Sequence, residues 1–161
     1  MSDALLTRLV RTLARPVPES EGRRARLHLL DWLACVAGAR QTAVAAAARR
    51  AGPDVLERVA CLGNVLEMDD VHRRALLHPG PVIWPSALSA ARETGCNMAA
   101  MLAGAVRGYE AMIAIGMMLD AHHYSLWHPT STAGGLGAAA AAASIFGLSP
   151  AQTVSALGHA A

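Results

Sequence analysis

The last quarter of the chain, residues 121–161, contains no Asp, Glu, Lys or Arg and is rich in alanine. A stretch this apolar cannot be exposed to water on all sides, so the fold must bury much of it. Prolines and glycines interrupt it at Pro129, Gly134, Gly135, Gly147 and Pro150. With these breaks, we do not expect this region to span a membrane. Aromatic residues make up only 4% of the chain, which argues against a β-sandwich. The sequence therefore predicts an all-α protein, a compact bundle of closely packed helices.

Length and charge narrow the class of protein further. The 161 residues, 53% of them apolar, suit one domain with a sizeable core. A net charge of +2, with arginines scattered and no interleaved aromatics, argues against nucleic-acid binding. The N-terminal residues do not form a secretory signal. Three widely spaced cysteines, Cys35, Cys61 and Cys96, lie in apolar surroundings. We expect reduced, buried thiols in a cytoplasmic protein that neither enters a membrane nor binds nucleic acid.

Apolar periodicity and helix-capping residues predict helices over residues 3–14, 18–38, 42–50, 84–94, 98–119 and 135–146. A last helix should begin at the capping box Ser149-Pro150-Ala151-Gln152. The long helix 98–119 carries Arg107 and Glu110 in its middle, which would be costly in lipid, so we expect it to be buried in a soluble protein. Its glycines at 104 and 108 should let a neighbouring helix approach closely.

Two His-Pro steps, His78-Pro79 and His128-Pro129, stand directly before helix-like runs. A helix N-terminus favours anions through its free N–H groups and its dipole. Histidine can move protons near neutral pH. The two steps therefore predict an acid–base site for an anionic substrate, with both imidazoles facing one cleft and a carboxylate on its wall.

Polar residues surround both steps. An acidic cluster of Glu67, Asp69, Asp70 and His72 precedes the first. If that segment is helical, Glu67 and Asp70 share a face. The second step leads into Thr130, Ser131 and Thr132 and then glycines, which allow a ligand to approach the backbone. A solvated charge cluster and structural histidines are the alternative interpretations. His28 and His159 are expected to be structural. His122 and His123 are expected to be loop residues, with lining of the same cleft as the alternative.

A metal site is the main chemical alternative. Carboxylates and imidazoles could bind a divalent ion at Glu67, Asp69, Asp70, His72 and His78. Their spacing matches no zinc or calcium motif, so a metal-dependent hydrolase is the weaker hypothesis. We expect neither a metal nor another cofactor.

Several segments together resemble the MmgE/PrpD family, which includes 2-methylcitrate dehydratase, cis-aconitate decarboxylase and iminodisuccinate epimerase. They occur in the family's order across nearly the whole chain: Leu29-Leu30-Asp31-Trp32-Leu33-Ala34-Cys35, the run from Gly63 to His72, the run from His78 to Leu88, Gly108-Tyr109-Glu110, and the run from Trp127 to Thr132.

The resemblance implies the N-terminal part of a large helical domain and a metal-free mechanism on small di- or tricarboxylates. Its acid–base residues would be Glu67 or Asp70 with His78 and His128. Substrate contacts would come from Asp69, His72, Thr130, Ser131 and Thr132. The chemistry would be proton removal, or loss of CO₂, next to a carboxylate, as in a lyase or an epimerase. The helix starts after the two histidines would stabilise the oxyanion.

The chain departs from the family in length and in charge. Family members are longer, and their later part contributes active-site lysines, a tyrosine and an α+β lid domain, whereas this chain has fourteen arginines and no lysine. We therefore expect residues 1–161 to form a single all-α domain that lacks the lid. It would be nearly inactive alone and would need a separately encoded C-terminal remainder. The alternative is a non-catalytic helical association module. In either case we expect a homo-oligomer, such as a dimer, that covers part of the charge-free region.

Overall fold

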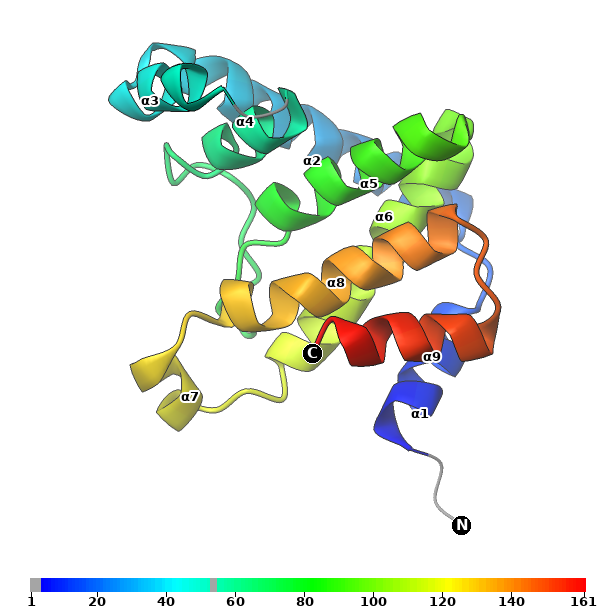
Figure 1. The fold of residues 1–161 in the computed structure, drawn as a ribbon. Helices are drawn as coiled ribbons and strands as arrows, with labels where there is room; N and C mark the ends of the chain where they lie inside the picture. Colours follow the sequence, from blue (N-terminus) through cyan, green and yellow to red (C-terminus); the bar gives the residue numbers. More distant parts are fainter. Residues whose placement is uncertain (1–3, 53–54) are drawn as a thin grey trace.

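The computed structural model describes residues 4–52 and 55–161, and in these ranges the chain forms helices and no β-strand (Figure 1). The all-α prediction is confirmed. The elements are α1 (Leu5–Leu13), α2 (Glu19–Gly38), the 3-10 turn η1 (Ala39–Gln41), α3 (Ala43–Ala51), α4 (Val55–Leu62), α5 (Gly80–Thr94), α6 (Met98–Gly116), α7 (Ala121–Leu126), α8 (Pro129–Ile145) and α9 (Pro150–His159).

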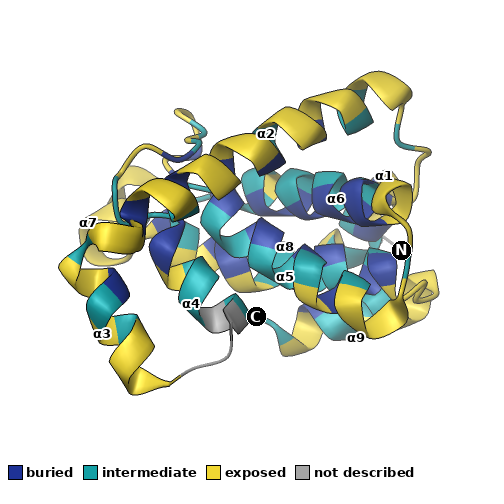
Figure 2. Ribbon diagram, turned by 90° about the horizontal axis from the view of Figure 1, so that it is seen from above, coloured by how far each residue is buried: buried dark blue, intermediate teal, exposed yellow. Residues whose placement is uncertain are grey.

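Helices α5, α6 and α8 pack side by side at the centre of the molecule (Figure 1). Helix α2 crosses α5 and α6, and its outer side is exposed (Figure 2). Helices α3 and α4 pack at one end of α2, whereas α1 and α9 pack together at the opposite end of the molecule. The main core contains the fully buried side chains of Trp32, Leu77, Ile83, Trp84 and Met112.

The close contact between α6 and α8 depends on glycine. A Cβ atom on Gly108 would lie 2.8 Å from Cβ of Ala141 and 3.0 Å from the carbonyl oxygen of Gly137. A Cβ atom on Gly104 would meet Ile145 at 2.4 Å. The prediction that these two glycines admit a neighbouring helix is confirmed.

Helix α6 is long and apolar enough to cross a membrane by length and composition alone. In this structure α1, α2, α5 and α8 pack around it. Its two charged residues bind groups on other elements: Arg107 donates to Ser144, and Glu110 pairs with Arg15. These contacts are those of a central helix in a packed bundle.

Two helices begin earlier than the sequence predicted, α5 at Gly80 and α8 at Pro129. Prolines lack an N–H group, which the first turn of a helix does not need, so the prolines that indicated turns lie inside first turns instead. At the start of α5, Gly80 donates its N–H to the distant side chain of Asp70, and at the start of α8 the side chain of His128 accepts the N–H of Thr130. Helix α7 was not predicted, and the side chain of Asp120 caps it. By contrast, the capping box at Ser149 is confirmed.

The cysteines only partly match the prediction of buried thiols. Cys35 is buried in α2, and that burial, with smaller effects of nearby Asp carboxylates, raises the pKa of its thiol. Cys61 is exposed and Cys96 partly exposed, so for these two the prediction is wrong.

Candidate functional site

A cavity of about 280 Å³ lies where the loop before α5 meets the start of α8. It is lined by Asn64, Glu67, His78, Pro81, His128, Thr130 and Ser131. The backbone N–H of His78 donates to Oγ1 of Thr130 at 3.0 Å, which fixes the loop to α8 across 52 positions of sequence. The prediction that His78 and His128 face one cleft, with a carboxylate on its wall, is confirmed, and the carboxylate is that of Glu67.

Asp69 holds the imidazole of His78 in place. Its Oδ2 lies 2.9 Å from Nδ1 of His78, and its Oδ1 accepts from the amide of Asn64 at 2.9 Å. The Asp69 side chain is only 1% exposed, while that of His78 is 22% exposed. An ionised carboxylate only accepts hydrogen bonds, so a neutral His78 paired with it carries its proton on Nδ1 and its lone pair on Nε2. This arrangement orients an imidazole to act as a base.

Glu67 stands in the left-handed region of backbone conformation, with φ 51°. That region typically costs a residue other than glycine about 1–3 kcal/mol, and such strain often occurs at functional sites. The segment is a turn and not a helix, so Glu67 and Asp70 do not share a helix face as the sequence suggested. Helix periodicity does not reveal this turn, because the contacts of Asp70 with Tyr109 and His28, 39 and 42 positions away, hold the segment that follows it.

Asp70 is not among the residues that line the cavity. Its Oδ1 accepts the N–H of Gly80 at 2.8 Å, and its Oδ2 accepts from the Tyr109 hydroxyl at 2.7 Å and lies 2.9 Å from Nδ1 of His28. A Cβ atom on Gly80 would come within 2.7 Å of Oδ1, so this contact requires glycine. Burial first, and then the Asp70 carboxylate, raise the pKa of Tyr109 well above its usual range. Asp70 therefore anchors the start of α5.

His128 caps α8: its Nδ1 accepts the N–H of Thr130 at 3.2 Å. A neutral His128 therefore carries its proton on Nε2, the opposite tautomer to that of His78. Of the hydroxyl residues that follow, Thr130 and Ser131 line the cavity. Thr132 instead lies 2.9 Å, Oγ1 to Nε2, from His123.

His72 shapes the loop outside the cavity lining. The ring Nδ1 of His72 accepts the backbone N–H of Ala75 at 3.1 Å, and the backbone N–H of His72 donates to the carbonyl of Leu77 at 2.9 Å. These two bonds close the turn that leads to His78. His72 thus makes a structural contact within the loop.

The two helix starts offer few free backbone donors, contrary to the expectation that they would stabilise an oxyanion. Gly80 donates to Asp70 and Thr130 to His128, and Pro81 and Pro129 have no N–H. The next N–H groups bond to carbonyls of the same turn. Donors for a ligand must therefore come from side chains, because the capping groups already occupy the backbone.

The cavity lining contains one carboxylate and no arginine. Arg73 and Arg74 follow the acidic cluster but are exposed. Within the described ranges, no group of three or more His, Cys, Asp or Glu side chains is placed to hold a metal ion. The polar side chains of the lining are those of Asn64, Glu67, His78, His128, Thr130 and Ser131.

Sequence reasoning missed three residues of this region. Asn64 lines the cavity and holds Asp69, and Tyr109 and His28 hold Asp70. Asn64 and Tyr109 lie in segments that resemble the family, which is the signal that could have identified them. His28 has no such signal, because its contact spans 42 positions of sequence.

No curated protein sequence matches the chain. Residues 58–161 match the family model described as the MmgE/PrpD N-terminal domain. That match covers more than half of the chain and contains every residue that lines the cavity. The protein therefore belongs to the MmgE/PrpD family, in the part that corresponds to the family's N-terminal domain.

Proposed function

We propose that the cavity between His78 and His128 removes or returns a proton next to a carboxylate of a small di- or tricarboxylate, as one half of a lyase or epimerase site. The observation that carries this proposal is the 2.9 Å contact between Nδ1 of His78 and the buried carboxylate of Asp69. It leaves Nε2 of His78 as the nitrogen available to a substrate.

The tautomers of the two histidines suit opposite roles. His78, with its proton on Nδ1, accepts a proton at Nε2 and is the base. His128, with Nδ1 bonded to Thr130, presents Nε2–H and is the acid or the oxyanion donor. Glu67 and the hydroxyl of Ser131 are the other polar groups of the lining that can contact a ligand. A base and an acid on two walls serve elimination, decarboxylation and epimerisation equally.

The proposed reaction requires positive charge that the cavity lining does not supply. Proton removal builds negative charge on an already anionic substrate, and cations in a water-poor site stabilise it. The chain has no lysine, and its arginines lie outside the cavity lining. We propose that a separately encoded remainder supplies these cations, so the chain alone turns over little substrate. Loss of such groups typically costs about a thousandfold in rate.

Turnover of 2-methylcitrate, cis-aconitate and iminodisuccinate tests this proposal, with the chain measured alone and after co-expression with its neighbouring reading frames. We expect turnover only when a lysine-bearing partner co-purifies, and we expect His78→Ala and His128→Ala to abolish it. Turnover near one per second by the isolated chain, abolished by His128→Ala, would show that the missing lysines do not matter.

A non-catalytic association role is the second candidate, favoured by apolar side chains beside the cavity. Leu126 is 64% exposed and Trp127 66% exposed at the end of α7, and Met118 and Tyr124 are exposed nearby in sequence. We propose that a second copy of the chain covers them. Light scattering should give a dimer or larger species, and Trp127→Ser should weaken it, whereas Leu27→Ser on the exposed side of α2 should not. A soluble monomer at micromolar concentration contradicts the association.

A further inference from the structure

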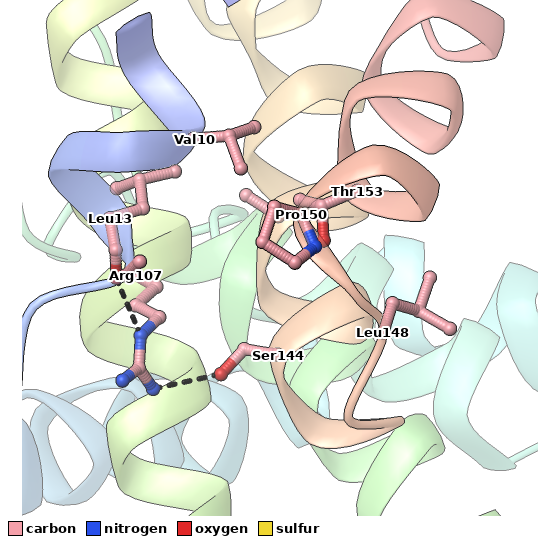
Figure 3. Close-up of a pocket in the computed structure, with 9 residues that line it drawn as sticks. Val10, Leu13, Arg107, Ser144, Leu148, Pro150 and Thr153 are labelled. Atoms are coloured by element: carbon pink, nitrogen blue, oxygen red, sulfur yellow. Dashed lines mark hydrogen bonds between the residues drawn. The ribbon is translucent and has the colours of Figure 1, made fainter. Parts of the chain in front are cut away.

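A second cavity, of about 280 Å³, lies at the far end of the bundle from α7, where α1 and α9 meet α6 and α8 (Figure 3). Most of its wall is apolar, and its polar groups are the guanidinium of Arg107 and the hydroxyls of Ser144 and Thr153. The wall is formed by Val10, Leu13, Ala14, Arg107, Ala140, Ser144, Leu148, Pro150 and Thr153. None of these residues lines the histidine cavity.

The guanidinium of Arg107 is held in place by neutral acceptors. Its Nε donates to the carbonyl of Leu13 at 2.8 Å, its Nη2 to the carbonyl of Arg15 at 3.3 Å, and its Nη1 to Ser144 Oγ at 2.9 Å. An arginine has five N–H donors, so one on each terminal nitrogen remains for a ligand or solvent. Two such donors are what a carboxylate takes in a bidentate pair.

No carboxylate neutralises this cation among the described residues. Glu110, one turn further along α6, is bound to Arg15. The carbonyls at the C-terminal end of α1 offset part of the charge, because a cation is favourable there. The bonds to the α1 end and to α8 restrict the side chain, so less rotamer entropy is lost when a ligand binds.

The space next to this cation is apolar and extends between α1 and α9. In Figure 3, the guanidinium of Arg107 and the hydroxyl of Ser144 lie in the lower part of the view, Val10 lies in the upper part, and Pro150 lies between them. An adjoining cavity of about 570 Å³ shares Val10, Ala14 and Pro150 with the first and continues along Ala151 and Val154. Among the described residues, Arg107 is the one cation in the lining of the first cavity, whereas Arg11 and Thr7 line the adjoining one. Within the first cavity, a cation beside an apolar wall suits a ligand with one anionic head and a short aliphatic tail.

We infer that the groove between α1 and α9 binds a small aliphatic monocarboxylate, with its head on Arg107 and Ser144 and its tail along Leu13, Val10 and Pro150. Di- and tricarboxylates are disfavoured, since a second carboxylate would lie against the apolar wall and lose its hydration. The groove is therefore a binding site distinct in place and in ligand class from the histidine cavity.

Methyl NMR with sodium hexanoate as the probe tests this inference, because Val10, Leu13 and Leu148 carry reporter methyl groups in the wall. Hexanoate should shift these methyl signals in a saturable way, and hexanol and succinate should bind more weakly. Each methylene added from butanoate to hexanoate should raise affinity by up to about fourfold. Equal shifts with hexanol, or no saturable shift with hexanoate, would overturn the proposal.

Variants locate the head and the tail. Arg107→Gln should weaken hexanoate binding by about ten- to a hundredfold, the usual size for a lost charged hydrogen bond. Arg107→Gln also removes the bonds that hold the end of α1, so a second variant is needed. Thr153→Phe fills the groove and leaves Arg107 intact, and it should abolish binding. His78→Ala, in the other cavity, should leave binding unchanged. Binding that survives both groove variants, or that is lost with His78→Ala, contradicts the site.

Discussion

Asp69 and Asp70 are neighbours in the chain, yet their carboxylates hold different histidines. Oδ2 of Asp69 lies 2.9 Å from Nδ1 of His78, and Oδ2 of Asp70 lies 2.9 Å from Nδ1 of His28. The first pair belongs to the cavity, while the second belongs to the contact between α2, α5 and α6. Two acidic residues that look alike in the sequence thus have separate contacts: Asp69 holds the imidazole of His78 at the cavity, and Asp70 anchors the start of α5.

Asp69→Asn should invert the tautomer of His78. The amide NH₂ of the new residue can donate to Nδ1, which moves the imidazole proton to Nε2 and removes the base from the cavity. Stability should fall by about 1–3 kcal/mol, because the buried group loses a matched partner. Nitrogen NMR of the His78 ring and urea unfolding measure the two effects.

Asp31→Asn is the matched control, since Asp31 is exposed on α2 and the charge change is the same. It should alter neither the His78 tautomer nor the unfolding midpoint appreciably. If Asp69→Asn left the proton of His78 on Nδ1, the positioning role of Asp69 would be wrong.

Glycine should be better tolerated than alanine at position 67. Because Glu67 has φ 51°, Glu67→Gly removes backbone strain that Glu67→Ala keeps. We expect the free energy of unfolding of the Gly variant to exceed that of the Ala variant by about 1 kcal/mol. The opposite order is expected at Arg26, which is exposed within α2. There the Ala variant should be more stable to unfolding than the Gly variant by about 1 kcal/mol. Thermal unfolding of the four variants checks the reversal, and the same order at both positions would contradict it.

Tyr109 should make the protein sensitive to alkali. Its pKa is raised in the folded state, whereas an unfolded tyrosine titrates near 10. The folded state then holds a proton that the unfolded state has lost, so stability is complete below about pH 10 and falls above it by up to about 1.4 kcal/mol per pH unit. Urea unfolding at a series of pH values should give a shallower decline for Tyr109→Phe than for the native chain. Tyr124→Phe, at an exposed position, should leave the slope unchanged, and equal slopes in all three proteins would contradict the prediction.

Local signals predicted the helices well but not the loop that builds the cavity. The caps at Asn97 and Ser149 and the left-handed Gly95 mark helix ends through bonds within a few residues, so the sequence reveals them. The loop from 63 to 79 is different. Its backbone is fixed by contacts with Thr130 and Tyr109, 52 and 39 positions away from their partners. The two His-Pro steps at helix starts therefore predicted correctly that His78 and His128 face one cavity, but the sequence did not show which acidic residue would line it.

The tautomers of the histidine rings test the central claim most directly. Long-range proton–nitrogen spectra at mildly alkaline pH should place the proton of His78 on Nδ1 and that of His128 on Nε2. Titration with citrate should shift both rings with one dissociation constant, weak because the lining holds no arginine, and should leave His159 on α9 unchanged. The same tautomer on both rings, or citrate shifts that follow different constants, would contradict a shared acid–base cavity.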